Sequence, residues 1–79
     1  NNHAEQIHNR INALRDFIKS DKQELEVLEN NLGKLSSAPN NDAFRTMIQG
    51  KIKNFTRKIR TKTELIELFK SKLNKQVSG

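Results

Sequence analysis

A chain of 79 residues, one third of them apolar and with neither Trp nor Tyr, has room for one domain with a thin core. The absence of Cys excludes disulfides, thiolate nucleophiles and most structural zinc sites. The net charge of +6 is uneven, because residues 1–35 carry five Lys or Arg against six Asp or Glu, whereas residues 43–79 carry ten against two. We therefore expect the second half of the chain to attract an anionic partner.

Residues 3–35 are predicted to form one long helix, since strong helix formers dominate and Pro is absent from them. Their apolar residues recur at alternating steps of four and three, which is the spacing of a coiled-coil seam. The positions of this first ladder are Ala4, Ile7, Ile11, Leu14, Ile18, Asp21, Leu25, Leu28, Leu32 and Leu35. Asp21 is its one polar member. Gly33, Ser36 and Ser37 indicate where the helix ends.

Residues 36–42 are predicted to form a loop, which contains the only proline, Pro39. Either Asn41 or Asp42 is expected to be the N-cap of the next helix, because a short side-chain oxygen can accept an unpaired N–H of the first turn. A spacer of this length lets two helices fold back on each other.

The second helix is predicted over residues 43–76, with its own ladder. The ladder positions are Ile48, Ile52, Phe55, Ile59, Lys62, Ile66, Phe69 and Leu73. Folding the chain so that Leu35 meets Ile48 brings the two charged positions, Asp21 and Lys62, into one layer. The pairs that then face each other are Leu28 with Phe55, Leu25 with Ile59, Ile18 with Ile66, and Leu14 with Phe69.

This matching predicts an all-α fold: a single domain over residues 1–79 that forms an antiparallel two-helix hairpin, an intramolecular coiled coil. Asp21 and Lys62 either pair with each other or extend separately to water. A pair would act mainly on register, because a slipped alignment would bury one charge against Leu or Ile.

Several apolar residues lie beside the seam, and Phe17 is expected near Leu65, as Glu24 is near Lys58. Phe17, Leu65 and Leu68 form either a stripe that docks a partner or a second copy, or simple side-wall packing. Phe44 and Met47 are expected to close the loop end over Leu35.

The sequence offers little for catalysis or metal binding. His3 and His8 are five residues apart and lie on different faces of a helix, so we expect no metal site. Glu24, Glu26 and Glu29 share one helix without a cleft that would desolvate a carboxylate, and no Gly-rich loop could cradle a phosphate. We expect neither enzymatic activity nor a cofactor.

The basic run at residues 50–62 has six cations in thirteen residues. Lys53, Arg57 and Arg60 are predicted on the outer surface, and Lys51 and Lys58 beside the seam. The run is either a solvated face or a surface for nucleic acid, membrane or acidic protein. We favour an acidic protein, because no aromatic residue is expected to be free for base stacking and the apolar face is committed to the seam.

Residues 7–76 resemble the homology-region-1 repeat, the antiparallel coiled-coil finger of Rho-family GTPase effectors. The resemblance rests on residues 11–14 (INAL), 25–32 (LEVLENNL), the loop at 39–42 and residues 59–73. Residues 21–24 (DKQE) replace the Lys-Glu-Gly-Ala-type stretch of the protein kinase C-related kinases. The sequence is therefore nearer to the divergent form of the repeat in F-BAR adaptor proteins.

The resemblance implies binding to the switch region of a Rho-family small GTPase in its GTP form, without catalysis. From surface chemistry, the expected contacts are Lys53, Arg57, Arg60, Lys58, Phe17, Leu65 and Leu68. The alternatives are a basic hairpin that binds nucleic acid and a structural coiled-coil oligomerisation domain, in which the hairpin associates with itself into a helical bundle, for example as a homodimer. No apolar run approaches the ~20 residues that span a bilayer, no signal peptide is recognised, and we expect a cytoplasmic fragment of a longer protein.

Overall fold

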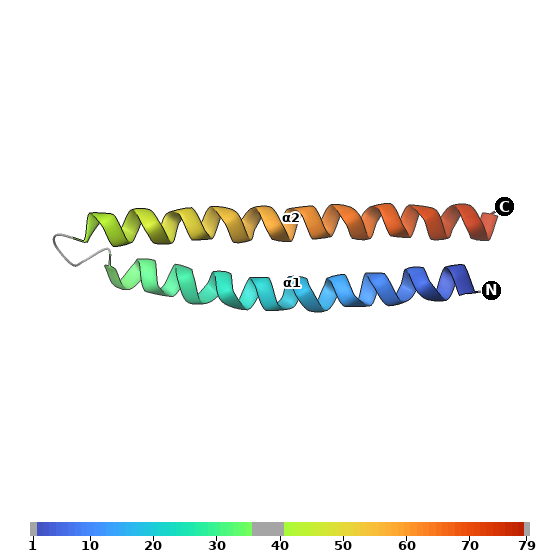
Figure 1. The fold of residues 1–79 in the computed structure, drawn as a ribbon, viewed down its shortest axis with the longest axis horizontal. Coiled ribbons are helices and arrows are strands. Elements are labelled where there is room, and N and C mark those ends of the chain that lie inside the picture. Colours follow the sequence, from blue (N-terminus) through green and yellow to red (C-terminus); the bar gives the residue numbers. More distant parts are fainter. Residues whose placement is uncertain (1, 36–40, 79) are drawn as a thin grey trace.

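The computed structural model describes residues 2–35 and 41–78, with side chains described for 3–35 and 41–75. Helix α1 spans Asn2–Leu35 and helix α2 spans Asp42–Ser78. The two helices run side by side in opposite directions along a rod whose Cα atoms extend over 61 Å (Figure 1). The predicted all-α, two-helix hairpin is confirmed.

Helix α2 starts at the predicted cap. The carbonyl of Asn41 accepts a hydrogen bond from the backbone N–H of Arg45 at 2.9 Å, which is the first bond of the helix. Asn41 is thus the N-cap, the first of the two candidates. The predicted bend at Pro39 lies outside the described residues.

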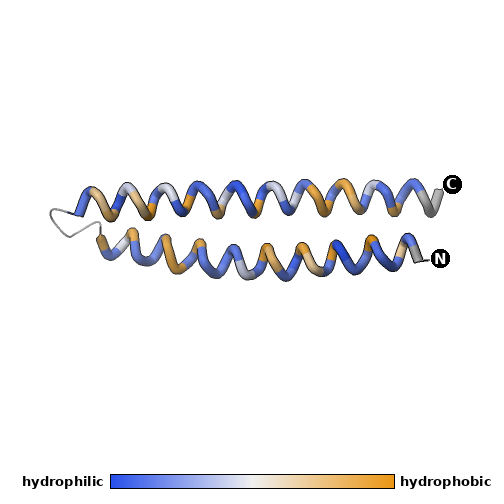
Figure 2. Tube along the Cα trace, in the orientation of Figure 1, coloured by the Kyte–Doolittle hydropathy of each residue, from blue (hydrophilic) through white to orange (hydrophobic). Residues whose placement is uncertain are grey.

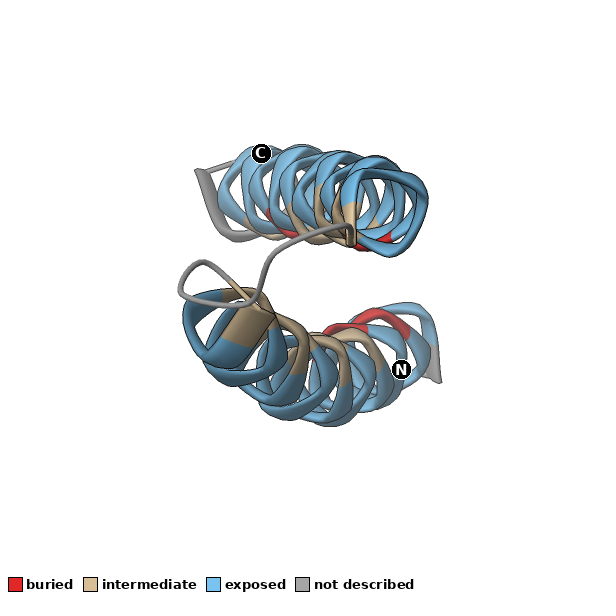
Figure 3. Cartoon of the chain, turned by 90° about the vertical axis from the view of Figure 1, so that its left-hand side faces the viewer, coloured by how far each residue is buried: buried red, intermediate tan, exposed pale blue. Residues whose placement is uncertain are grey.

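Burial follows the two ladders closely. Among the described side chains of α1 and α2, every ladder position except Ala4 is buried or half-buried, and Arg45 alone joins them from outside the ladders. These residues face each other across the interface, and hydrophobic positions line the inner sides of both helices (Figures 2 and 3). Ala4 is exposed because, in this register, its level coincides with the end of α2.

An ion pair between Asp21 and Lys62 identifies the register of the two helices. The ammonium of Lys62 donates a hydrogen bond to Oδ2 of Asp21, and the two side chains are 24% and 15% exposed. The alternative in which both side chains extend separately to water is therefore wrong. Steps of seven residues along both helices from this pair place Leu28 opposite Phe55 and Leu14 opposite Phe69, as predicted.

The core is concentrated toward the end of the hairpin where α1 begins and α2 ends, which we call the open end. Ile7, Ile11 and Ile66 are buried there, and four half-buried residues pack against them: Leu14, Ile18, Phe69 and Leu73. The one other buried apolar side chain among those described is Ile48, near the loop. Full burial of each such side chain contributes on the order of 2 kcal/mol, and three of the four buried apolar side chains among those described belong to this cluster.

At the loop end, Arg45 joins the two helices. Its Nη2 donates to the carbonyl oxygen of Leu35 at 3.1 Å, and its Nη1 pairs with Oδ1 of Asp42 at 2.8 Å. Carbonyls in the last turn of a helix lack intrahelical partners, so Arg45 caps the C-terminal end of α1.

Phe44 and Met47 do not close the loop end. They are 58% and 49% exposed, so that prediction is wrong. The reason is register: a step of three back from Ile48 reaches Arg45, which takes the position facing α1, and the two apolar residues fall to the side of it.

Candidate functional site

The outer surface of α2 carries a cluster of three cations, Lys53, Arg57 and Arg60, which we call the basic face. Their spacing of four and three residues places them on one side of the helix, away from Ile52 and Phe55, which face α1. All three are exposed, and none forms an ion pair with any residue of 3–35 or 41–75. A shallow hollow of about 330 Å³ lies among them, beside Thr56.

Lys58, also predicted as a contact, is directed elsewhere. Its ammonium lies 4.9 Å from the centre of the Phe55 ring, a cation–π contact at the edge of the seam. No ion pair joins it to Glu24, near which it was expected. Lys58 and Arg57 both line a second shallow hollow, of about 240 Å³, together with Lys62.

Among the described side chains, six large apolar ones are exposed: Phe17, Val27, Phe44, Met47, Leu65 and Leu68. In the register of the seam, each occupies one of the two heptad positions that lie on the same side of an antiparallel pair, and we call this side the apolar flank. The equivalent positions of the opposite flank, over residues 5–33 and 42–74, hold no large apolar residue. The hairpin is therefore amphipathic from side to side as well as from inside to outside.

The apolar flank contains a groove of about 370 Å³ at the open end. Phe17 and Leu65 line it from opposite helices, which confirms that they lie close together. Leu14 and Phe69, members of the core, also line it, with Ala13 and Arg10 completing the wall. Phe17 is 60% and Leu68 61% exposed, so these side chains project into solvent and do not serve as side-wall packing.

The structure thus divides the predicted contact residues between two surfaces. Lys53, Arg57 and Arg60 face outward, whereas Phe17, Leu65 and Leu68 lie on the apolar flank. Along α2, Arg57 and Leu65 are eight residues apart, about 12 Å at helical rise, and they point in different directions.

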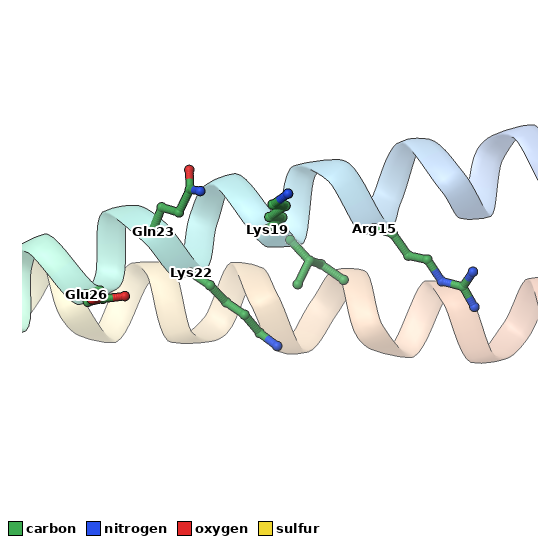
Figure 4. Close-up of a pocket in the computed structure, with 6 residues that line it drawn as sticks. Arg15, Lys19, Lys22, Gln23 and Glu26 are labelled. Carbon is green, nitrogen blue, oxygen red and sulfur yellow. The ribbon is translucent and has the colours of Figure 1, made fainter.

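A second cluster of cations, on α1, was missed by the sequence analysis. Arg15, Lys19 and Lys22 line a groove of about 420 Å³ with Gln23 and Glu26, on the flank opposite the apolar one. Figure 4 shows Arg15 and Lys22 extending to one side of α1, and Lys19 and Gln23 to the other. The signal was present as the same spacing of four and three residues. The total charge of α1 did not reveal this cluster, because the acidic residues of the same helix offset its cations. One of these acidic residues, Asp21, pairs with Lys62 and is not free to neutralise the cluster.

The described residues hold no group of three His, Cys, Asp or Glu side chains that could bind a metal ion. In the described part of the chain, neither helix includes a stretch apolar and long enough to cross a bilayer.

No family model, curated protein or solved structure matches this chain.

Proposed function

We propose that the hairpin is a non-enzymatic protein-interaction module whose basic face binds an acidic protein surface. One observation carries the proposal: Lys53, Arg57 and Arg60 stand together on one helix without a carboxylate partner among the described residues. Because the helix backbone already fixes their spacing, binding orders three side chains and no backbone, in addition to the translational and rotational freedom that any association loses. Complementary charge would raise the association rate and select for acidic partners.

Among acidic surfaces, we propose the switch region of a Rho-family GTPase in its GTP form. The support for this partner is the resemblance of residues 7–76 to the homology-region-1 repeat, together with a basic second helix in a hairpin of this size. GTPase switch surfaces combine acidic residues with an apolar centre. Exposed aliphatic stems of the basic face can contact that centre while their charged ends pair with carboxylates.

Nucleic acid is a weaker candidate, although the reason differs from the one expected. Two aromatic side chains, Phe17 and Phe44, are exposed, so the expectation that none is free for stacking is wrong. Neither lines the hollow between Lys53, Arg57 and Arg60. Single strands are bound by stacking platforms placed along a basic groove, and the basic face lacks such a platform.

The test compares two triple charge reversals. The first is Lys53→Glu, Arg57→Glu and Arg60→Glu, on the basic face. The matched control is Arg15→Glu, Lys19→Glu and Lys22→Glu, which has the same spacing and the same change in net charge. Calorimetric titration with Rho-family GTPases loaded with a GTP analogue should show a loss of about tenfold or more in affinity for the first variant only, at least ~1.4 kcal/mol.

Three outcomes would contradict the proposal. Equal binding of the GTP-loaded and GDP-loaded forms would remove the GTPase switch as the partner. An equal loss in both variants would mean that only total charge matters and that the basic face is not a site. Tight binding of duplex or single-stranded nucleic acid, falling steeply across a salt series, would favour the nucleic-acid function instead.

A further inference from the structure

The groove on the apolar flank opens directly onto the core. Leu14 and Phe69 pack against the buried cluster of Ile7, Ile11 and Ile66, and the same two residues line the groove. The core of the hairpin is thus in contact with solvent along one side. A second layer of helices would close this opening, as the packed layers of a helical bundle do.

The exposed area is larger than a compact chain of this mass would have. The accessible surface is 6216 Å², whereas a compact protein of 9.1 kDa is expected to expose about 4,900 Å². The excess of about 1,300 Å² comes from a shape only two helices thick. A standard interface buries roughly 800 Å² on each partner, so one further layer on one flank would remove most of the excess.

The apolar flank is complementary to itself. Phe17 and Leu68 project from it, and the groove between the helices lies on the same surface. An interface between identical copies needs both a projection and a hollow on each patch. Arg10 is the one charged residue that lines the groove, which fits the depletion of charge at the centre of such interfaces.

We propose that this flank binds a second copy of the chain, which gives a four-helix bundle with its twofold axis parallel to the helices. In that arrangement α1 of each copy lies against α2 of the other, in opposite directions. Phe17 then meets Leu65 and Leu68 of the second copy at the same level along the rod, and Glu24 meets Lys58. Arg10 and Lys72 would meet at the open edge of the bundle, where solvent and salt screen their repulsion.

The basic face points away from this interface. Lys53, Arg57 and Arg60 lie on the outer side of α2, nearer the opposite flank, so pairing of the apolar flanks leaves them in solvent. The dimer would carry two basic faces on opposite sides of the bundle. It could therefore bind two copies of an acidic partner, or one partner that presents two sites.

Sedimentation equilibrium of the whole chain, from low to high micromolar concentration, tests the proposal. The expected mass is twice the 9.1 kDa of one chain. The variant Phe17→Glu with Leu68→Glu should sediment at half that mass. Both positions are exposed, so circular dichroism should show helix content unchanged. The control Lys19→Glu with Gln23→Glu, on the opposite flank, should stay dimeric.

The melting temperature gives an independent readout, because a dimer becomes more stable as chain concentration rises. We expect this dependence in the native chain and its loss in the Phe17→Glu, Leu68→Glu variant. A native chain that remains at the monomer mass at high micromolar concentration would overturn the proposal. So would a dimer that survives the two flank substitutions.

The direction of pairing is tested separately. Since the chain has no Cys, a spin label can be placed at Thr46→Cys alone, at the loop end and off the apolar flank. Parallel pairing brings the two loop ends together and predicts a distance between labels on the order of 20–30 Å, about two to three helix spacings. A much longer distance would place the loops at opposite ends and exclude the proposed axis. Neither result depends on whether the basic face binds a GTPase.

Discussion

The two halves of the hairpin have ladders of similar apolar residues but are held together differently. At the open end, Ile7, Ile11 and Ile66 are buried in a shared cluster. In the loop half, Ile48 is buried among half-buried positions, and Arg45 bonds across to the last turn of α1.

The two halves differ in how the chain connects their helices. In the loop half, the covalent connection keeps the helices close at a small entropic cost. At the open end, only packing keeps them together. The identity of a ladder residue therefore does not determine how much it contributes.

The largest expected effect is at the open end. Ile11→Ala should lower the free energy of unfolding by about 3 kcal/mol, since it leaves a cavity in the buried cluster. Ile52→Ala makes the same change at a half-buried position of the loop half and should cost about half as much. Urea unfolding followed by circular dichroism measures both. Equal losses would show that the two halves are packed alike.

The next-largest loss of stability is expected at the ion pair of Asp21 and Lys62, which lies between the two halves of the hairpin. Lys62→Leu leaves the carboxylate of Asp21 without its partner and should cost about 1–2 kcal/mol, less than for a fully buried pair because both side chains keep some exposure. Adding Asp21→Leu should recover most of this loss. A double variant less stable than the sum of the single changes would mean that the two residues do not act as a pair.

The smallest effect is expected at the loop end. Arg45→Met removes the hydrogen bond to the carbonyl of Leu35 and should cost about 1 kcal/mol. Asp42→Asn weakens only an exposed ion pair and should change stability little, since the Asp42 side chain is 92% exposed. If both variants lose the same stability in thermal unfolding, the contact of Arg45 with α1 is not what holds this end.

Local spacing was sufficient to predict the hairpin and its register. Coiled-coil positions repeat over short distances, so Asp21 and Lys62 could be assigned to one layer before any contact was known. Arg45 was missed because it continues the α2 ladder with a polar residue. Its partner is a backbone carbonyl, which side-chain patterns do not reveal. Because Arg45 was not recognised as the residue that faces α1, Phe44 and Met47 were wrongly predicted to close the loop end.

The surfaces were only partly predictable. The exposure of Lys53, Arg57 and Arg60 followed from the seam on the other side of α2. The sequence analysis did not predict that the contact residues are divided between two surfaces. That division depends on the side of the seam on which each residue lies in three dimensions. The cations of α1 were missed for a different reason: the total charge of the helix is near neutral, and only the spacing of Arg15, Lys19 and Lys22 reveals that they form a cluster.

The first turn of α1 and the last turn of α2 lie at the same end of the rod (Figure 1), whose Cα atoms extend over 61 Å. Any domain joined to either helix at this end would lie there, far from the last turn of α1 and the first turn of α2. A fluorescent donor and acceptor fused one to each terminus would thus sit close enough for strong energy transfer. Melting of the hairpin would then be visible as loss of that transfer, without a probe anywhere in the binding surfaces.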